Sequence, residues 1–79
     1  MEAGKTYIVR KNIFNFKVGQ ILTLIRYGYQ AYYGEYNFMF TDMENRNICV
    51  VLRGDDEEDM KIYHHLNEYF EESDDNTNL

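Results

Sequence analysis

The chain of 79 residues contains no proline and no tryptophan, and it has a single cysteine. One cysteine excludes an internal disulfide, so the fold depends on its core without a covalent cross-link. Cys49 lies in the apolar stretch Ile48–Leu52, which predicts a small buried side chain rather than a reactive thiol. A lone reduced cysteine is typical of cytoplasmic proteins, and we expect a cytoplasmic location.

Long apolar runs are also missing. The longest has five residues, and the segment Met1–Lys5 contains no apolar core. A membrane helix needs about 20 apolar residues and a signal peptide about 7–15. The sequence therefore predicts neither. We expect a soluble protein with one small domain over residues 1–71 and a disordered acidic tail over residues 72–79.

Acidic side chains are scarce in the first two thirds of the chain and abundant in the last third. Residues 1–53 hold seven basic and four acidic side chains, whereas residues 54–79 hold one basic and ten acidic side chains. The whole chain carries a net charge of −6. This division predicts a mildly basic body with an acidic appendage, and it bears on the choice of partner rather than on the fold.

Four segments have the β-branched and aromatic content of strands: residues 5–10, 20–29, 36–41 and 48–53. Residues 42–47 are rich in asparagine and aspartate, as expected of a hairpin loop. In the second segment, Leu22 and Leu24 face one side while Ile21 and Ile25 face the other. Both sides are apolar, so we expect another element to cover the Ile21 side.

The apolar period changes from two to 3.6 after Gly54. Asp55 and Glu58 have the spacing of a capping box, which predicts one amphipathic helix from Asp56 to Glu71. We expect this helix to cover the second apolar face of the sheet. The predicted core comprises Leu22, Leu24, Phe38, Phe40, Ile48, Val50, Leu52, Leu66 and Phe70.

The run Phe14-x-Phe16-x-x-Gly19-x-x-Leu22-x-Leu24 resembles the diverging turn and following strand of SH3-like barrels. In this reading Phe14 and Phe16 share one face of an extended segment. The resemblance implies a mainly β (α+β) fold: an SH3-like, partly open antiparallel barrel of about five strands with one C-terminal helix. The layout also resembles short bacterial domains of unknown function, which implies a bacterial or phage origin. A proline-peptide site does not carry over, because the chain lacks the tryptophan and proline of that site.

Catalytic and metal-binding patterns are weak. The only serine lies near the C-terminus, and no nucleophile, base and oxyanion donor can be nominated together, so we expect no enzyme and no cofactor. His64 and Glu68 have metal-ligand spacing, but the adjacent His65 points about 100° away on a helix and no third ligand is near. We therefore predict no metal site.

Tyrosine is the residue in excess, and five tyrosines lie between residues 27 and 36. They cannot all face inward, so we predict an exposed binding patch for a protein partner or a second copy. Its members are Arg26, Tyr27, Tyr29, Tyr32, Tyr33 and Tyr36. One alternative is single-stranded nucleic acid on the same face beside Arg10, Lys11 and Lys17, although the net charge disfavours it. Another is an inhibitor or immunity-type protein acting through an acidic helix face, made of Asp55, Asp56, Glu57, Glu58, Glu68 and Glu71.

Overall fold

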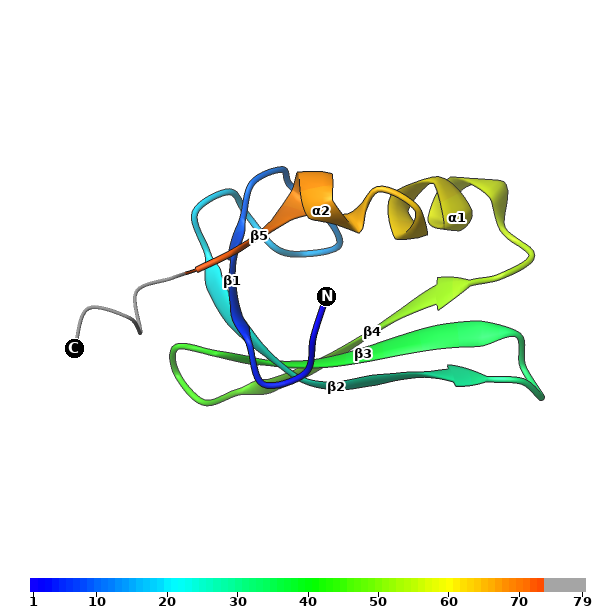
Figure 1. The fold of residues 1–79 in the computed structure, drawn as a ribbon, viewed down its shortest axis with the longest axis horizontal. Helices are drawn as coiled ribbons and strands as arrows, with labels where there is room; N and C mark the ends of the chain where they lie inside the picture. The colour runs from blue at the N-terminus through cyan, green and yellow to red at the C-terminus, as the bar shows by residue number, and fades with distance from the viewer. Residues whose placement is uncertain (74–79) are drawn as a thin grey trace.

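The computed structural model describes residues 1–73 and shows a mainly β domain with one open, five-stranded antiparallel sheet (Figure 1). The sheet order is β4-β3-β2-β1-β5, and its edges do not pair with each other. The elements are β1 (Thr6–Val9), β2 (Ile21–Gln30), β3 (Glu35–Asp42), β4 (Asn47–Arg53), α1 (Glu57–Tyr63), α2 (Leu66–Tyr69) and β5 (Phe70–Glu72). The four predicted strand segments are therefore confirmed, and β5 lies where a helix was predicted.

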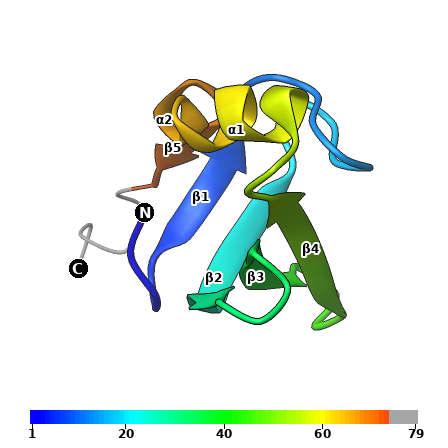
Figure 2. The same cartoon turned by 90° about the vertical axis from the view of Figure 1, so that its right-hand side faces the viewer.

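Both helices lie on one side of the sheet, and β1 curves over toward them (Figures 1 and 2). The core fills the space between, and its centre is an aromatic cluster. The Phe40 ring lies 5.6 Å from that of Phe16 and 5.5 Å from that of Phe70, measured between centroids. We call this part of the molecule, with β1, β5 and α2 around the cluster, the closed end.

Six predicted core residues are buried: Leu22, Leu24, Phe38, Phe40, Leu52 and Phe70. The other three, Ile48, Val50 and Leu66, are only partly buried and pack against the core rim. Four buried apolar residues were not predicted: Tyr7, Val9, Ile13 and Phe16. These four come from β1 and the following turn, which reach the core because the sheet bends over it.

The prediction that the helix covers the Ile21 side of the sheet is wrong. α1 and α2 cover the Leu22 side, and within residues 1–73 no element lies over the opposite face (Figure 1). Ile25 is exposed on that account. Cys49 is exposed as well, contrary to prediction, because it alternates with the partly buried Ile48 and Val50 and so faces outward on an edge strand.

Phe14 and Phe16 do not share an extended face. Phe14 has a φ of +55° and is exposed, whereas Phe16 is buried. The Ile13 and Phe16 backbones exchange hydrogen bonds of 3.3 and 2.8 Å across a tight turn. The predicted glycine turn is present, since Gly19 has a φ of +96°, a conformation that side chains with a Cβ rarely adopt.

The single predicted helix is in fact two short helices and a strand. α1 ends at Tyr63, and His65 leaves the helical region with φ −132° and ψ 32°. The chain then forms one helical turn and enters β5, where Phe70 lies opposite Val9. A continuous helix could not supply the strand hydrogen bonds of β5 while burying Phe70. The N-cap is Asp56 rather than Asp55, and its carboxylate accepts the Asp59 N–H at 3.0 Å.

The sheet extends to Glu72, one residue beyond the predicted domain boundary. Ser73 of the predicted tail donates its N–H to the Thr6 carbonyl at 2.8 Å, and residues 74–79 lie outside the described residues. Among residues 1–73, no helix is long and apolar enough to cross a membrane.

Candidate functional site

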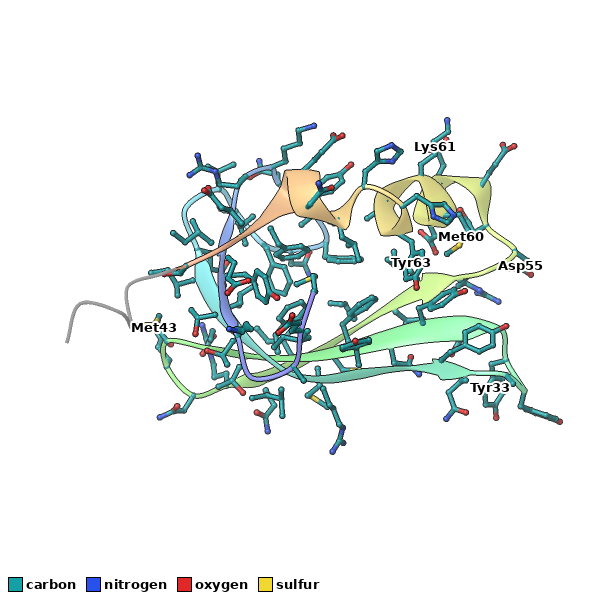
Figure 3. All side chains as sticks on the ribbon, viewed as in Figure 1. Tyr33, Met43, Asp55, Met60, Lys61 and Tyr63 are labelled. Atoms are coloured by element: carbon teal, nitrogen blue, oxygen red, sulfur yellow. The ribbon has the colours of Figure 1, made fainter. Side chains whose placement is uncertain are left out.

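The hairpin formed by β2 and β3 extends beyond the rest of the sheet. β1 pairs with β2 only at Ile21–Thr23, whereas β3 pairs with it as far as Gln30. A register shift between Leu24 and Arg26 marks a β-bulge at the point where β1 departs. We call residues 25–36, from the bulge to the start of β3, the open end. Tyr33 marks its tip in Figure 3, on the side of the molecule opposite Met43.

Three tyrosines form a row from the hairpin to α1. The ring centroids of Tyr29 and Tyr36 are 4.7 Å apart, and those of Tyr36 and Tyr63 are 4.1 Å apart. Tyr63 points from α1 toward the sheet in Figure 3. Burial in this row raises the pKa of the Tyr63 hydroxyl, and the Tyr36 and Tyr27 hydroxyls add to the rise. The Tyr29 ring therefore packs on Tyr36, and Tyr36 packs in turn on Tyr63 of α1.

Four of the five tyrosines predicted for the binding patch are exposed. Tyr27 is 55% exposed, Tyr29 56%, Tyr32 88% and Tyr33 66%. Tyr36 is only partly exposed, because Tyr29 and Tyr63 lie on either side of it in the row. Tyr27 stacks on Phe38 at 6.2 Å, so the exposed rings rest on the edge of the core. The open end thus presents large, rigid aromatic surface with polar hydroxyl groups.

The outer face of the same hairpin contains a shallow hollow of about 500 Å³. It is lined by Arg26, Tyr27, Gly28, Tyr29, Gln30, Asn37, Met39 and Cys49. The Arg26 side chain forms no ion pair or hydrogen bond with any of residues 1–73. The hollow therefore places a free guanidinium group and two side-chain amides on the outer face of the hairpin, whereas the Tyr27 and Tyr29 rings belong to the inner face.

The predicted acidic helix face does not exist as one surface. Asp55, Asp56, Glu57 and Glu58 surround the start of α1, and Asp55 points away from the body in Figure 3. Glu68 and Glu71 lie beyond the break between the helices. They form ion pairs with bases near the N-terminus: Glu68 with Lys11 at 3.1 Å and Glu71 with Arg10 at 3.0 Å. The hydrogen bond from Lys11 lowers the pKa of Glu68, and the charge of Lys11 adds to the effect.

These ion pairs also bear on nucleic-acid binding. Of the four bases predicted to assist the tyrosines, Arg10 and Lys11 are paired with carboxylates, and both lie at the closed end. Lys17 lies in the turn before β2, also at the closed end. Only Arg26 is on the tyrosine-bearing hairpin.

The histidines of the predicted weak metal motif have other neighbours. The His65 Nδ1 atom lies 2.8 Å from the Lys61 carbonyl oxygen, and the His64 ring contacts Tyr63 edge-on. Within residues 1–73, no three His, Cys, Asp or Glu side chains are grouped so that they could hold a metal ion.

The sequence reasoning missed two parts of this site. Tyr63 was in neither the predicted core nor the predicted patch, and nothing in the sequence connects it to Tyr36. The point at which the N-terminal segment stops pairing with β2 was not predicted either. A glycine at position 4 is a usable sequence signal of a turn, and in the structure Gly4 has a φ of +90°.

Comparison with known proteins gives a fold but no family. No protein-family model matches the chain, and no curated protein matches it in sequence. The chain is similar in structure to an integron cassette protein from the mobile metagenome of Vibrio cholerae, with a TM-score of 0.80 and 20% identity. The likeness covers 92% of this chain and 86% of that one. At this identity the two proteins share a fold, and the fold is one that occurs in a bacterial cassette protein.

Proposed function

We propose that the protein is a non-catalytic interaction module whose contact surface is the open end. One observation carries the proposal: four tyrosines, each more than half exposed, gather on one projecting hairpin. Tyrosine buries a large area on contact and has few rotatable bonds to immobilise, so it is enriched in protein interfaces. The ring contacts from Tyr29 through Tyr36 to Tyr63 connect the hairpin to α1 and restrain it, which lowers the entropic cost of binding.

A protein partner, including a second copy, fits this surface better than nucleic acid. Single strands bind where basic side chains follow the stacking rings, because phosphate contacts supply much of the affinity. Arg26 is the one base on the hairpin, and the chain as a whole carries −6. The alternative of an acidic inhibitor is weakened because two members of the acidic set are paired within the molecule.

The test is affinity capture from native cells with wild-type protein and two variants. Tyr32→Ala/Tyr33→Ala removes the rings at the hairpin tip. Val18→Ala/Met43→Ala is the matched control, because both side chains are exposed and apolar but lie outside the open end. We expect wild type and control to recover a shared set of proteins that the tyrosine variant loses.

Equal recovery by all three proteins would remove the hairpin tip from the contact surface. Binding to a mixed-sequence oligonucleotide at low and moderate salt provides the second arm. Salt-sensitive binding that is lost in Arg26→Ala and Tyr29→Ala would replace the protein partner by single-stranded nucleic acid.

A further inference from the structure

The open end also exposes unpaired backbone. The last bond between β2 and the N-terminal segment is donated by the Gly4 N–H to the Leu24 carbonyl at 2.7 Å. Beyond the bulge, Arg26–Gln30 pairs with β3 alone among the described strands. Five residues of β2 therefore form a free edge. Nearer the closed end, the sheet continues past β2 to β1 and β5.

The bonding pattern identifies which groups point outward. The N–H and the carbonyl of Leu24 both bond to the N-terminal segment, at Lys5 and Gly4, and so point away from β3. Its partner Phe40 therefore directs its own N–H and carbonyl away from β2, toward β4. Alternation along β3 gives Phe38 and Tyr36 the same direction. Their partners on β2 are Tyr27 and Tyr29. The N–H and carbonyl groups of these two tyrosines therefore point away from β3, into the free edge.

The other two free edges are short, in β5, or blocked at one end, in β4. β5 has three residues, and Glu71 and Glu72 in it form ion pairs with Arg10 and Lys5. At β4 the outward N–H of Arg53 already donates to the Asp59 carboxylate at 2.9 Å, and five consecutive acids begin at Asp55. Short length and charge are the usual means of preventing edge-to-edge pairing. The free edge of β2 is longer than β5, and Arg26 is the one charged side chain on it.

We propose that the free edge of β2 pairs with the same edge of a second copy, antiparallel, with the two-fold axis at Gly28. In this register Tyr27 lies opposite Tyr29 of the second copy, and each such pair exchanges two backbone hydrogen bonds. The outward groups on the edge are then satisfied. The inference rests on the proposed function, because it names a second copy as the partner of the tyrosine-bearing hairpin.

The side chains fit this register. Arg26 falls opposite Gln30 of the second copy, so the guanidinium group gains an amide acceptor and meets no like charge. Tyr27 and Tyr29 form cross-strand aromatic pairs on the inner face. At the axis Gly28 faces Gly28, where the strands approach most closely, and a Cβ added there would meet no atom of its own chain within 4 Å. A pairing centred on Tyr27 or on Tyr29 would place two copies of that tyrosine directly opposite each other, and only that one pair within Arg26–Gln30 would exchange backbone hydrogen bonds, instead of two.

Cysteine cross-linking tests the register. In a Cys49→Ser background, Gly28→Cys places two thiols at the axis, with Cα atoms about 4.5 Å apart, within disulfide range. Gln30→Cys is the control within the same strand, because its thiols would lie four residues from each other across the pair. Val50→Cys is the matched control at the centre of the β4 edge. We expect Gly28→Cys to form disulfide dimers about tenfold faster than either control in mild oxidant, because only its thiols meet at disulfide distance. Equal rates, or a faster Val50→Cys, would overturn the proposal.

Sedimentation velocity over a range of concentrations provides the second arm. Wild type should shift from 9.6 kDa toward twice that mass as its concentration rises. Tyr29→Pro removes an outward N–H without touching the ladder to β3, and it should stay monomeric. Tyr29→Val retains that N–H and should still associate. A wild type that stays monomeric throughout would refute edge pairing, whereas the affinity capture with Tyr32→Ala/Tyr33→Ala judges the proposed function separately, because those two residues lie outside the paired segment.

Discussion

The closed and open ends are both aromatic, yet only one is a core. At the closed end Phe16, Phe40 and Phe70 pack edge-on or stacked with centroids 5.5–6.4 Å apart, and all three are buried. At the open end Tyr27 packs on Phe38 at 6.2 Å and Tyr29 on Tyr36 at 4.7 Å, yet both tyrosines remain more than half exposed. The difference is coverage: β1 and β5 extend over the phenylalanines and stop short of the tyrosines. Aromatic content alone therefore does not separate a core from a contact surface.

Breaking the closed end should have the largest effect. Phe40→Ala leaves a cavity among the Phe16 and Phe70 rings, and we expect a loss of about 3–5 kcal/mol in the free energy of unfolding. Such a loss is most of the stability of a small domain. Phe14→Ala is the matched control, since Phe14 is 41% exposed, and it should cost less than about 1 kcal/mol. Urea unfolding followed by circular dichroism measures both, and equal losses would contradict the assignment of the core.

The link between the two ends is α1, which reaches the open end through Tyr63. Tyr63→Ala removes the ring that stacks on Tyr36 at 4.1 Å, and we expect a loss of about 1–2 kcal/mol. Tyr63→Phe retains the ring and should cost less than about 0.5 kcal/mol. Hydrogen exchange should show that Tyr63→Ala also loosens α1. A loss as large in Tyr63→Phe would mean that the hydroxyl group, rather than the stack, holds the helix.

The β3–β4 turn, which belongs to neither end, should be sensitive to acid. The Asp42 carboxylate accepts the Arg46 and Glu44 N–H groups at 2.9 Å each, and the Arg46 backbone bond is the main cause that lowers the pKa of Asp42. A lowered pKa in the folded state contributes stability above the ordinary value of 3.8, and this stability is lost as the pH falls below it.

The measurement is the free energy of unfolding between pH 7 and about pH 2.5. We expect Asp42→Asn to flatten the acid limb of the curve, because the asparagine cannot take up the proton. Glu57→Gln provides the control, since Glu57 is exposed and forms no ion pair within residues 1–73. Wild type and Asp42→Asn curves that stay parallel would show that the turn does not depend on this charge.

Changes at the tip of the open end should have the smallest effect on folding. Tyr32→Ala/Tyr33→Ala removes rings that contact each other at 4.9 Å and are otherwise exposed. We expect each substitution to change the free energy of unfolding by no more than about 0.5 kcal/mol. Thermal unfolding with the melting temperature unchanged within error would confirm that these rings are not required for the fold. A clear drop would instead make them part of the core.

Much of the sheet could be predicted because strand patterns are local. The alternation of Tyr36, Phe38 and Phe40 fixes which residues of β3 face inward, and the structure agrees. The parity of the tyrosines also predicted that some must be exposed, and four are. What that exposure is used for stays a prediction.

The errors came from contacts between distant segments. Phe70 has the right period for a helix, but burial against Phe16 and Phe40 and pairing with β1 require a strand there. Cys49 lies in the most apolar run of the chain, yet it is exposed because β4 is an edge and its outer face has no cover within residues 1–73. In both places local propensity was outweighed by the position of the segment in the sheet.

The sequence by itself determined the strand segments, the inward face of each strand and the surplus of tyrosine, because these depend on residue type and on a period of two. Only the tertiary structure decided which face the helices cover, where β1 stops and which backbone groups of β2 remain unpaired. Those features arise where the chain bends at Gly4 and at the bulge before Arg26, and a bend determines which distant segments meet.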